Sequence, residues 1–131
     1  IFRHPPGHAQ RTLAYFMALG HYDAQIRRLR RHLAERRRIL QSAIDTEGFF
    51  SHTAAHFGGT SFWVSGPEWL DSRVLAELAK KSGVLIEAGD VFFDVKKSPL
   101  NFFRLAYSAI SSDKIPKGVS KLAETMRRLK P

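Results

Sequence analysis

The sequence predicts an α+β fold in which a small mixed or antiparallel sheet carries helices packed on one face. Two observations lead to this prediction. In four segments apolar residues recur at three- and four-residue steps, which is the period of an amphipathic helix. Between these segments lie short runs of alternating or continuous apolar residues, which are typical of strands. The predicted order is two helices, a strand, a helix, two strands and a final helix.

Length and composition are those of one globular domain over residues 1–131. Hydrophobic residues make up 44% of the chain, and glycine and proline are few. No apolar run approaches the roughly 18 residues that a membrane span needs, so we expect no membrane partner. The absence of cysteine excludes disulfides and thiolate metal sites and is typical of a reducing compartment. We therefore expect a cytoplasmic protein.

Two helices are predicted at the start of the chain. The first covers residues 8–19. The second has Asp23 as its N-cap and reaches about Ile44. Its apolar stripe is formed by Ile26, Leu29, Leu33, Leu40 and Ile44. Arg36 or Arg37 interrupts this stripe, and we expect its alkyl stem to lie along the core while the charged head reaches out.

The net charge of +9 is concentrated in the second helix. Seven of the 21 basic residues lie there, namely Arg27, Arg28, Arg30, Arg31, Arg36, Arg37 and Arg38. Such a run is usually a solvated helix face or a surface for an acidic neighbouring domain. Direct contact with DNA is the alternative, but no zinc-finger or helix-turn-helix pattern supports base recognition. We expect at most weak, salt-sensitive DNA binding without sequence preference.

The middle of the chain alternates between strands and one helix. Residues 47–57 have an ambiguous pattern that fits either a strand or an extended segment. Residues 60–64 are predicted to form a strand. Asp71 is placed to cap a helix over residues 72–82. The predicted buried residues of this helix are Val74, Leu75, Leu78 and Ala79. After Gly83, which suits a left-handed position, residues 84–86 are predicted as a short apolar strand.

A strand and a helix end the predicted fold. The strand covers residues 102–108, and alternation places Phe103, Leu105 and Tyr107 on one face. The last helix follows Asp113, with Pro116 tolerated because it lies near the first turn. Its predicted buried face is formed by Ile115, Val119, Leu122, Met126 and Leu129.

Arg104 is the strongest candidate site residue, because it lies within an otherwise apolar strand. Its neighbours on the same face include Ala106 and Ser108, which leave room beside the guanidinium. A charge near a core costs several kcal/mol unless it is paired. A planar guanidinium suits a carboxylate or phosphate, which it holds with two parallel hydrogen bonds. The partner is either a ligand or one of the acids of this chain, and the residue alone does not decide between them.

Other patterns carry little chemistry. His52 and His56 have the spacing of two metal ligands on a helix, but their segment is not helical and no third ligand is near, so we predict no metal site. The sequence has no phosphate-binding glycine loop, and none of its serine, histidine and aspartate residues lies in a recognised catalytic motif. We therefore predict no catalytic residue. Lys80 and Lys81 lie on the exposed side of a predicted helix, so neither is placed to form a Schiff base.

Four motifs in order carry a family resemblance. They are Gly58-Gly59-Thr60-Ser61-Phe62-Trp63-Val64, Gly83-Val84-Leu85-Ile86-Glu87-Ala88-Gly89-Asp90-Val91-Phe92-Phe93, Arg104-Leu105-Ala106-Tyr107-Ser108 and Lys117-Gly118-Val119-Ser120-Lys121-Leu122-Ala123-Glu124. The set resembles the C-terminal small domain of fold-type I pyridoxal-phosphate aminotransferases. The lead-in Gly20-His21-Tyr22-Asp23 and the arginine-rich helix narrow this to the MocR group, in which a GntR-type winged helix is fused to an aminotransferase-like domain.

The resemblance implies a role for Arg104 and a fragment of a larger protein. In that family the matching arginine binds the α-carboxylate of an amino-acid ligand. The lysine that bears pyridoxal phosphate, the large lobe and the winged helix all precede the segment that begins at Ile1. Two positions depart from the family pattern: Tyr107 replaces a more frequent phenylalanine, and Ala88 stands where a proline is common, which loosens the turn before Gly89.

The resemblance therefore implies the effector-sensing lobe of a pyridoxal-phosphate-dependent regulator that recognises an amino-acid-like small molecule. The parent protein is expected to be a homodimer that contacts DNA only through its winged helix, with no tightly bound cofactor on this chain. The alternative is the small domain of a true aminotransferase, so the chain is not assigned as an enzyme. A third alternative is a basic α+β interaction module with no ligand of its own.

Overall fold

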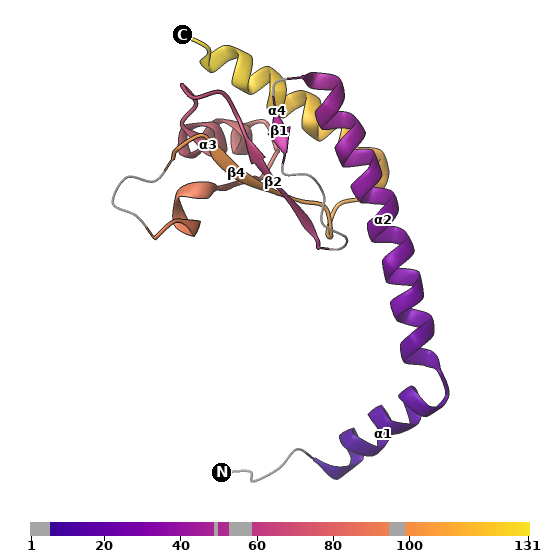
Figure 1. The fold of residues 1–131 in the computed structure, drawn as a ribbon. Coiled ribbons are helices and arrows are strands. Elements are labelled where there is room, and N and C mark those ends of the chain that lie inside the picture. The colour runs from indigo at the N-terminus through magenta and orange to yellow at the C-terminus, as the bar shows by residue number, and fades with distance from the viewer. Residues whose placement is uncertain (1–5, 49, 53–58, 95–98) are drawn as a thin grey trace. The chain divides into compact units, whose positions relative to one another are not determined.

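The computed structural model describes residues 6–48, 50–52, 59–94 and 99–131 (Figure 1). Contacts divide the chain into two compact units, residues 1–34 and residues 35–131. The boundary falls within helix α2, which covers His21–Glu47. The two units are described one after the other.

Unit 1 is helical where it is described. Helix α1 covers Gly7–Ala18, as predicted, and Gly20, with φ +75°, separates it from α2. Asp23 lies within the first turn of α2 and not at its cap, because the helix already begins at His21. In that turn the carboxylate still complements the partial positive charge of the helix N-terminus.

The predicted apolar stripe of α2 is buried only at its C-terminal end. Leu40 and Ile44 are buried, whereas Ile26 and Leu33 are half-buried and Leu29 is exposed. None of residues 6–34 is buried, because two helices offer too little surface to enclose a core of their own. The stripe is therefore a continuous pattern in the sequence, but only its end belongs to the core of unit 2.

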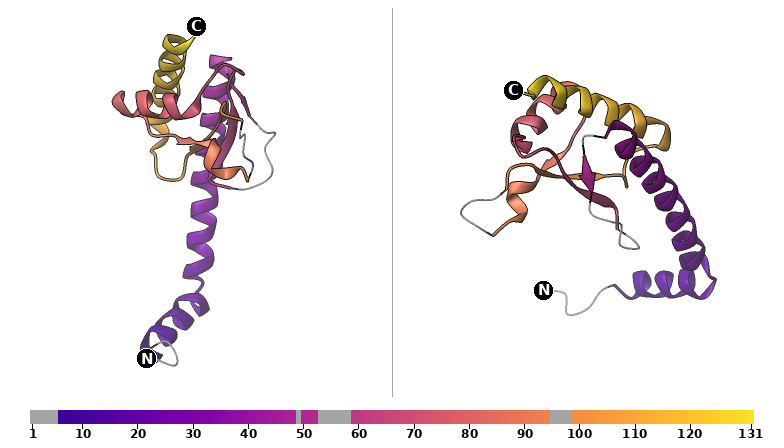
Figure 2. Two further views of the ribbon diagram at one scale, coloured as in Figure 1. Left: turned by 90° about the vertical axis from the view of Figure 1, so that its left-hand side faces the viewer. Right: turned by 45° about the horizontal axis from the view of Figure 1, so that its top comes forward.

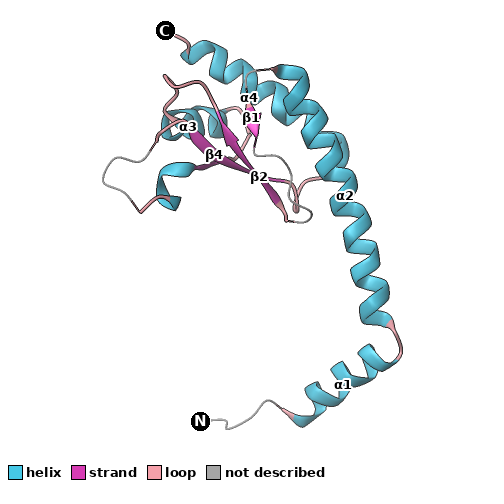
Figure 3. Cartoon of the chain, in the orientation of Figure 1, coloured by secondary structure: helices cyan, strands magenta, loops and turns pink. Residues whose placement is uncertain are grey.

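Unit 2 is built on a four-stranded antiparallel sheet, in which the strands follow the order β1-β2-β4-β3 (Figure 3). Strand β1 covers Ser51–His52, β2 covers Ser61–Ser65, β3 covers Glu87–Ala88 and β4 covers Phe102–Ala106. Strand β1 lies within the ambiguous stretch 47–57, most of which is outside the described residues. The α+β class with an antiparallel sheet is confirmed.

One face of the sheet forms the core. Phe62 and Val64 of β2 are buried with Phe103 and Leu105 of β4, and the helices lie over this side (Figure 2). Tyr107 follows β4 and is buried as predicted; its hydroxyl donates to the carbonyl oxygen of Gly59 over 2.8 Å. A buried tyrosine is stabilised when its hydroxyl finds such a partner.

Helix α3 covers Ser72–Lys81 and has defined signals at both ends. Asp71 caps it, because its carboxylate accepts from the backbone N–H of Arg73 over 2.9 Å. Gly83, with φ +78°, ends it: its N–H donates to Lys80 and the N–H of Val84 donates to Ala79, which is the Schellman pattern.

Two predictions around α3 are wrong in detail. Leu75 and Ala79 are buried one turn apart, but Val74 is 46% exposed, because it lies one residue outside the face that they define. Residues 84–86 are not a strand, and Leu85 is 80% exposed. The backbone of Val84 is engaged in closing α3, so pairing with β4 starts later, at Glu87.

Helix α4 covers Ile115–Leu129 after a short 3₁₀ turn over Ser112–Lys114, and Pro116 lies in its first turn. Its buried residues include Ile115, Val119, Leu122 and Met126, as predicted, whereas Leu129 is half-buried. The two arginines that interrupt the α2 stripe are half-buried, and Arg36 donates to the carbonyl oxygen of Ser108 over 2.5 Å. The guanidinium of Arg37 lies over the ring of the buried Phe62, so the expectation that its charged head reaches out is wrong.

Among the described residues, no helix is both long enough and apolar enough to cross a membrane.

The cap of α3 gives a prediction about stability. Asp71→Ala should lower the free energy of unfolding by about 0.5–2 kcal/mol, because an N–H at the helix start loses its acceptor. Asp71→Asn keeps an acceptor oxygen and should cost less. The measurement is urea unfolding of both variants against wild type.

The effect should depend on pH. The side-chain hydrogen bond from Arg73 lowers the pKa of Asp71 below 3.8, so the ionised form is favoured in the folded state. A depressed carboxyl pKa stabilises the fold above the unfolded value and loses this contribution as the pH falls through the folded value. The gap between wild type and Asp71→Asn should therefore close as the pH falls below about 4. A gap that stays constant down to pH 2 would contradict the role of the charge.

Candidate functional site

The candidate site lies on the face of the sheet opposite the core, here called the outer face. Its residues alternate with the core residues along each strand: Ser61, Trp63, Ser65, Glu87, Phe102, Arg104 and Ala106. Arg104 is at the centre of this face, because its Cα partner on β2 is Trp63 and its partner on β3 is Glu87. Three side chains from three strands thus form one row.

Glu87 and Phe92 contact the guanidinium of Arg104 in the part of the chain that the structure describes. Its Nη2 atom forms an ion pair with Oε2 of Glu87, and its central carbon lies 5.5 Å from the ring centroid of Phe92. The side chains of Arg104 and Glu87 are 44% and 45% exposed. Strand β4 therefore carries the arginine on its open face, and the expectation of a charge near the core that needs pairing is wrong. Alternation gives the reason, because Arg104 is one residue out of phase with Phe103 and Leu105.

An aromatic cluster lies beside the arginine and contacts it through Phe92. Trp63 is stacked on Phe102 at 5.8 Å between ring centroids and an angle of 15°, and it meets Phe92 edge to face at 5.5 Å. Phe93 contacts both Trp63 and Phe102. Phe92 and Phe93 come from the 3₁₀ turn Gly89–Phe92 and the residue after it.

Gly89 brings this 3₁₀ turn close to the sheet. A Cβ atom at this position would lie 2.5 Å from the carbonyl oxygen of Phe102 and 2.9 Å from the indole ring of Trp63. Such distances are well inside van der Waals contact, and the first neighbour is backbone that has little freedom to move. Only glycine permits the approach that places Phe92 beside the guanidinium.

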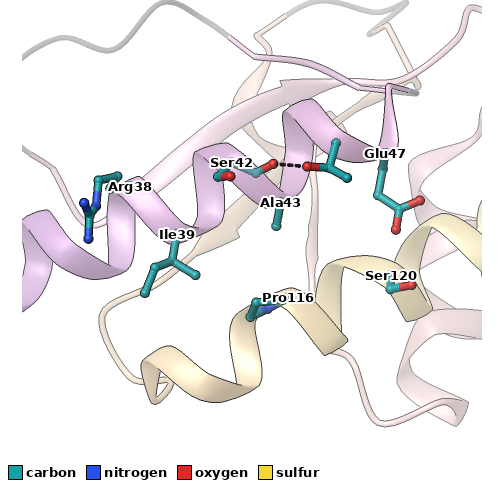
Figure 4. A pocket seen from close by; sticks show the side chains of 8 residues that line it. Arg38, Ile39, Ser42, Ala43, Glu47, Pro116 and Ser120 are labelled. Atoms are coloured by element: carbon teal, nitrogen blue, oxygen red, sulfur yellow. Dashed lines mark hydrogen bonds between the residues drawn. The ribbon is translucent and has the colours of Figure 1, made fainter.

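A hollow lies between α2 and α4 on the surface of unit 2, away from the outer face of the sheet (Figure 4). Arg38, Ile39, Ser42 and Ala43 line it from α2, and Pro116 and Ser120 line it from α4. Ser42 contributes its backbone carbonyl to the hydroxyl of Thr46 over 2.7 Å, which is a local helix bond. Arg38 of the arginine run lines this hollow, as does Glu47, which forms an ion pair with Arg127 over 2.6 Å.

The remaining candidates do not converge on the outer face. His56 and the side chain of His52 lie outside the described residues, and the described residues contain no group of three metal-ligand side chains. Lys80 and Lys81 are exposed, as predicted. No lysine in the described part of the chain is buried, so these residues do not fit the role of a lysine that carries pyridoxal phosphate.

The fold matches solved aminotransferases. An α-aminoadipate aminotransferase from Thermus thermophilus superposes on 89% of the chain with a TM-score of 0.78 and 24% identity. A kynurenine aminotransferase from Pyrococcus horikoshii covers 88% of the chain with a TM-score of 0.75 and 28% identity. The chain covers 30% and 29% of those two proteins. The chain is the C-terminal portion of an aminotransferase-like domain, and the resemblance of its motifs is confirmed.

Its curated relatives include transcriptional regulators. The HTH-type transcriptional regulator TauR of Rhodobacter capsulatus is 44% identical over 127 residues, which is 97% of the chain. YdfD of Bacillus subtilis, an uncharacterised HTH-type regulator, is 27% identical over 92% of the chain. The aromatic-amino-acid aminotransferase 1 of Thermococcus litoralis is 36% identical over 53% of the chain. The chain spans about a quarter of the length of the two regulators, and no family model matches it.

The partners of Arg104 could not be assigned from the sequence. Glu87 is separated from it by 17 positions, and the register that pairs them depends on where α3 ends. The sequence does contain the aromatic residues of the cluster, since Phe92 and Phe93 follow Gly89 closely and Phe102 begins the next strand. Residue type alone does not distinguish an aromatic cluster on the outer face from core residues. Gly89 is the one local signal for this arrangement, because a glycine beside a short strand often marks a position where another segment of backbone comes close.

The close approach at Gly89 can be tested by adding one methyl group. Gly89→Ala should lower the free energy of unfolding by about 1–3 kcal/mol, because the new Cβ collides with backbone and with Trp63. Gly118→Ala is the matched control: it lies in α4 with no atom within 4 Å of the added Cβ, so it should be neutral or stabilise by up to about 1 kcal/mol. Equal stability changes in denaturant for both variants would contradict this account.

Proposed function

We propose that this chain is the effector-sensing lobe of a pyridoxal-phosphate-dependent regulator of the MocR/GntR type, in which Arg104 anchors the carboxylate of an amino-acid-like ligand. The observation that carries the proposal is the position of Arg104 on the outer face. Its guanidinium is half-exposed and is positioned by Glu87 and Phe92. A guanidinium in that setting offers several N–H donors to a planar carboxylate.

The aromatic cluster supports a ligand site at this place. Trp63, Phe92 and Phe102 give the guanidinium an apolar border, and ligand sites commonly combine such walls with a few polar groups. Phe92 is 50% exposed. Several large apolar residues of α1 are also exposed, including Phe16 at 41%. Exposed apolar surface of this kind commonly marks a contact with another part of a protein. It suits a lobe that is covered by a large lobe elsewhere in a longer protein.

The regulator assignment has support from the relatives. The two regulators match 97% and 92% of the chain, including the arginine-rich helix α2, whereas the aromatic-amino-acid aminotransferase matches 53%. In the proposed protein a winged helix contacts DNA, a lysine outside this chain carries pyridoxal phosphate, two subunits associate, and the site of action is the cytoplasm.

A true aminotransferase is the second candidate. The solved structures with this fold, covering 89% and 88% of the chain, are aminotransferases. The two candidates differ in what the full-length protein does with DNA and with amino acids. A regulator should bind an operator upstream of a gene that it controls and respond to an amino-acid-like ligand. An aminotransferase should convert an amino acid and a 2-oxo acid into the exchanged pair and bind no operator.

Arg104 can be tested in the full-length protein with a panel of amino acids and the corresponding decarboxylated amines. Arg104→Ala should weaken binding of the amino acids by about 1.5–3 kcal/mol and leave amine binding unchanged, because only the carboxylate loses its charged partner. Arg104→Lys should recover little of the loss, because an ammonium lacks the planar fork. Affinities from calorimetry and melting temperatures provide the measurement.

The fold should tolerate both substitutions. The ion pair with Glu87 is exposed, so its loss costs about 0–1 kcal/mol and leaves no buried unpaired acid. A large drop in melting temperature with unchanged amino-acid affinity would instead assign Arg104 to an internal salt bridge and overturn the ligand role.

A further inference from the structure

We propose that Glu87 competes with the carboxylate of a ligand for Arg104 and thereby lowers the affinity of the site for carboxylates. The inference rests on the proposed role of Arg104. The inference adds Glu87, on the neighbouring strand β3, to the site of Arg104. In this role Glu87 weakens the binding of a ligand.

The geometry places Glu87 where a ligand carboxylate would bind. Glu87 and Arg104 are direct Cα partners in the antiparallel β3–β4 pair, so both side chains leave the same face of the sheet. Oε2 of Glu87 forms an ion pair with Nη2 of the guanidinium, so it occupies a donor that a ligand carboxylate would use. A ligand carboxylate can hold a guanidinium through two parallel hydrogen bonds.

The exposure of the pair makes it displaceable. Both side chains are nearly half-exposed, so the attraction between them is weakened by water, and a surface pair of this kind contributes little. At the same time the negative charge of Glu87 repels a second carboxylate brought to the same guanidinium.

Phe92 keeps Arg104 in place when Glu87 is changed. Its ring lies 5.5 Å from the guanidinium carbon, and the 3₁₀ turn that carries it is held against the sheet through Gly89. A cation over an aromatic face retains a favourable interaction at an exposed site. Loss of the Glu87 charge should therefore free the donors of Arg104 without releasing the side chain.

The experiment compares propionate with its neutral amide, propionamide, on the full-length protein by isothermal titration calorimetry. Glu87→Gln should bind propionate on the order of tenfold more tightly than wild type, because one like charge close to the probe is removed. Propionamide binding should not change. Glu87→Asp, which keeps the charge on a shorter side chain, should fall between wild type and Glu87→Gln.

Glu124→Gln is the matched control. Glu124 is an exposed acid on α4, away from the outer face, and the substitution changes the net charge equally. Its propionate affinity should equal that of wild type. An equal gain in Glu124→Gln and Glu87→Gln would reduce the effect to net charge and overturn the inference.

The remaining outcomes separate this inference from the proposed function. Unchanged or weaker propionate binding in Glu87→Gln, with binding abolished in Arg104→Gln, overturns the competition but retains Arg104 as the anchor. Propionate binding that survives in Arg104→Gln overturns the proposed role of Arg104 itself. Absence of saturable propionate binding in both wild type and Glu87→Gln also overturns the competition. A merely structural role of Glu87 would lower the melting temperature of Glu87→Gln and leave propionate affinity unchanged.

Discussion

Strand β4 is the constraint on which the rest of unit 2 depends. It pairs with β2 along its full length and with β3 at two positions, so it is the central strand between them. Because its side chains alternate, Phe103 and Leu105 enter the core while Arg104 leaves on the other side. A shift of one residue in the pairing would bury the guanidinium and expose both apolar side chains. The apolar side of β4 thus fixes where the arginine points.

The elements around β4 secure this register from both ends. The backbone N–H of Tyr107 donates to the carbonyl oxygen of Thr60, and the hydroxyl donates to Gly59, which ties the end of β4 to the start of β2. At the other end, Gly89 packs against the carbonyl of Phe102. The orientation of Arg104 is therefore a consequence of packing contacts that the arginine does not itself make.

The sequence predicted the elements better than it predicted their partners. The helices ending at Ala18 and Lys81, and the alternation around Arg104, follow from local signals such as caps, glycines and periodicity, and the structure confirms them. The prediction of a strand at residues 84–86 was wrong. Apolar content does not reveal that the backbone N–H of Val84 is used to close helix α3. Pairings such as Glu87 with Arg104 depend on register, which arises from contacts between distant segments and has no local signal.

The hydrophobic core and the half-exposed Arg104–Glu87 pair lie on opposite sides of the sheet. The inner face contains fully buried residues from α2, α3, α4 and the strands, so unit 2 obtains its hydrophobic stabilisation there. On the outer face the charged pair remains half-exposed and Phe92 is exposed, so these residues add little to folding. Side chains that a fold does not need for its own stability are free to be selected for contacts with other molecules. The core of unit 2 and the register of β4 should therefore persist when Arg104 or Glu87 is replaced.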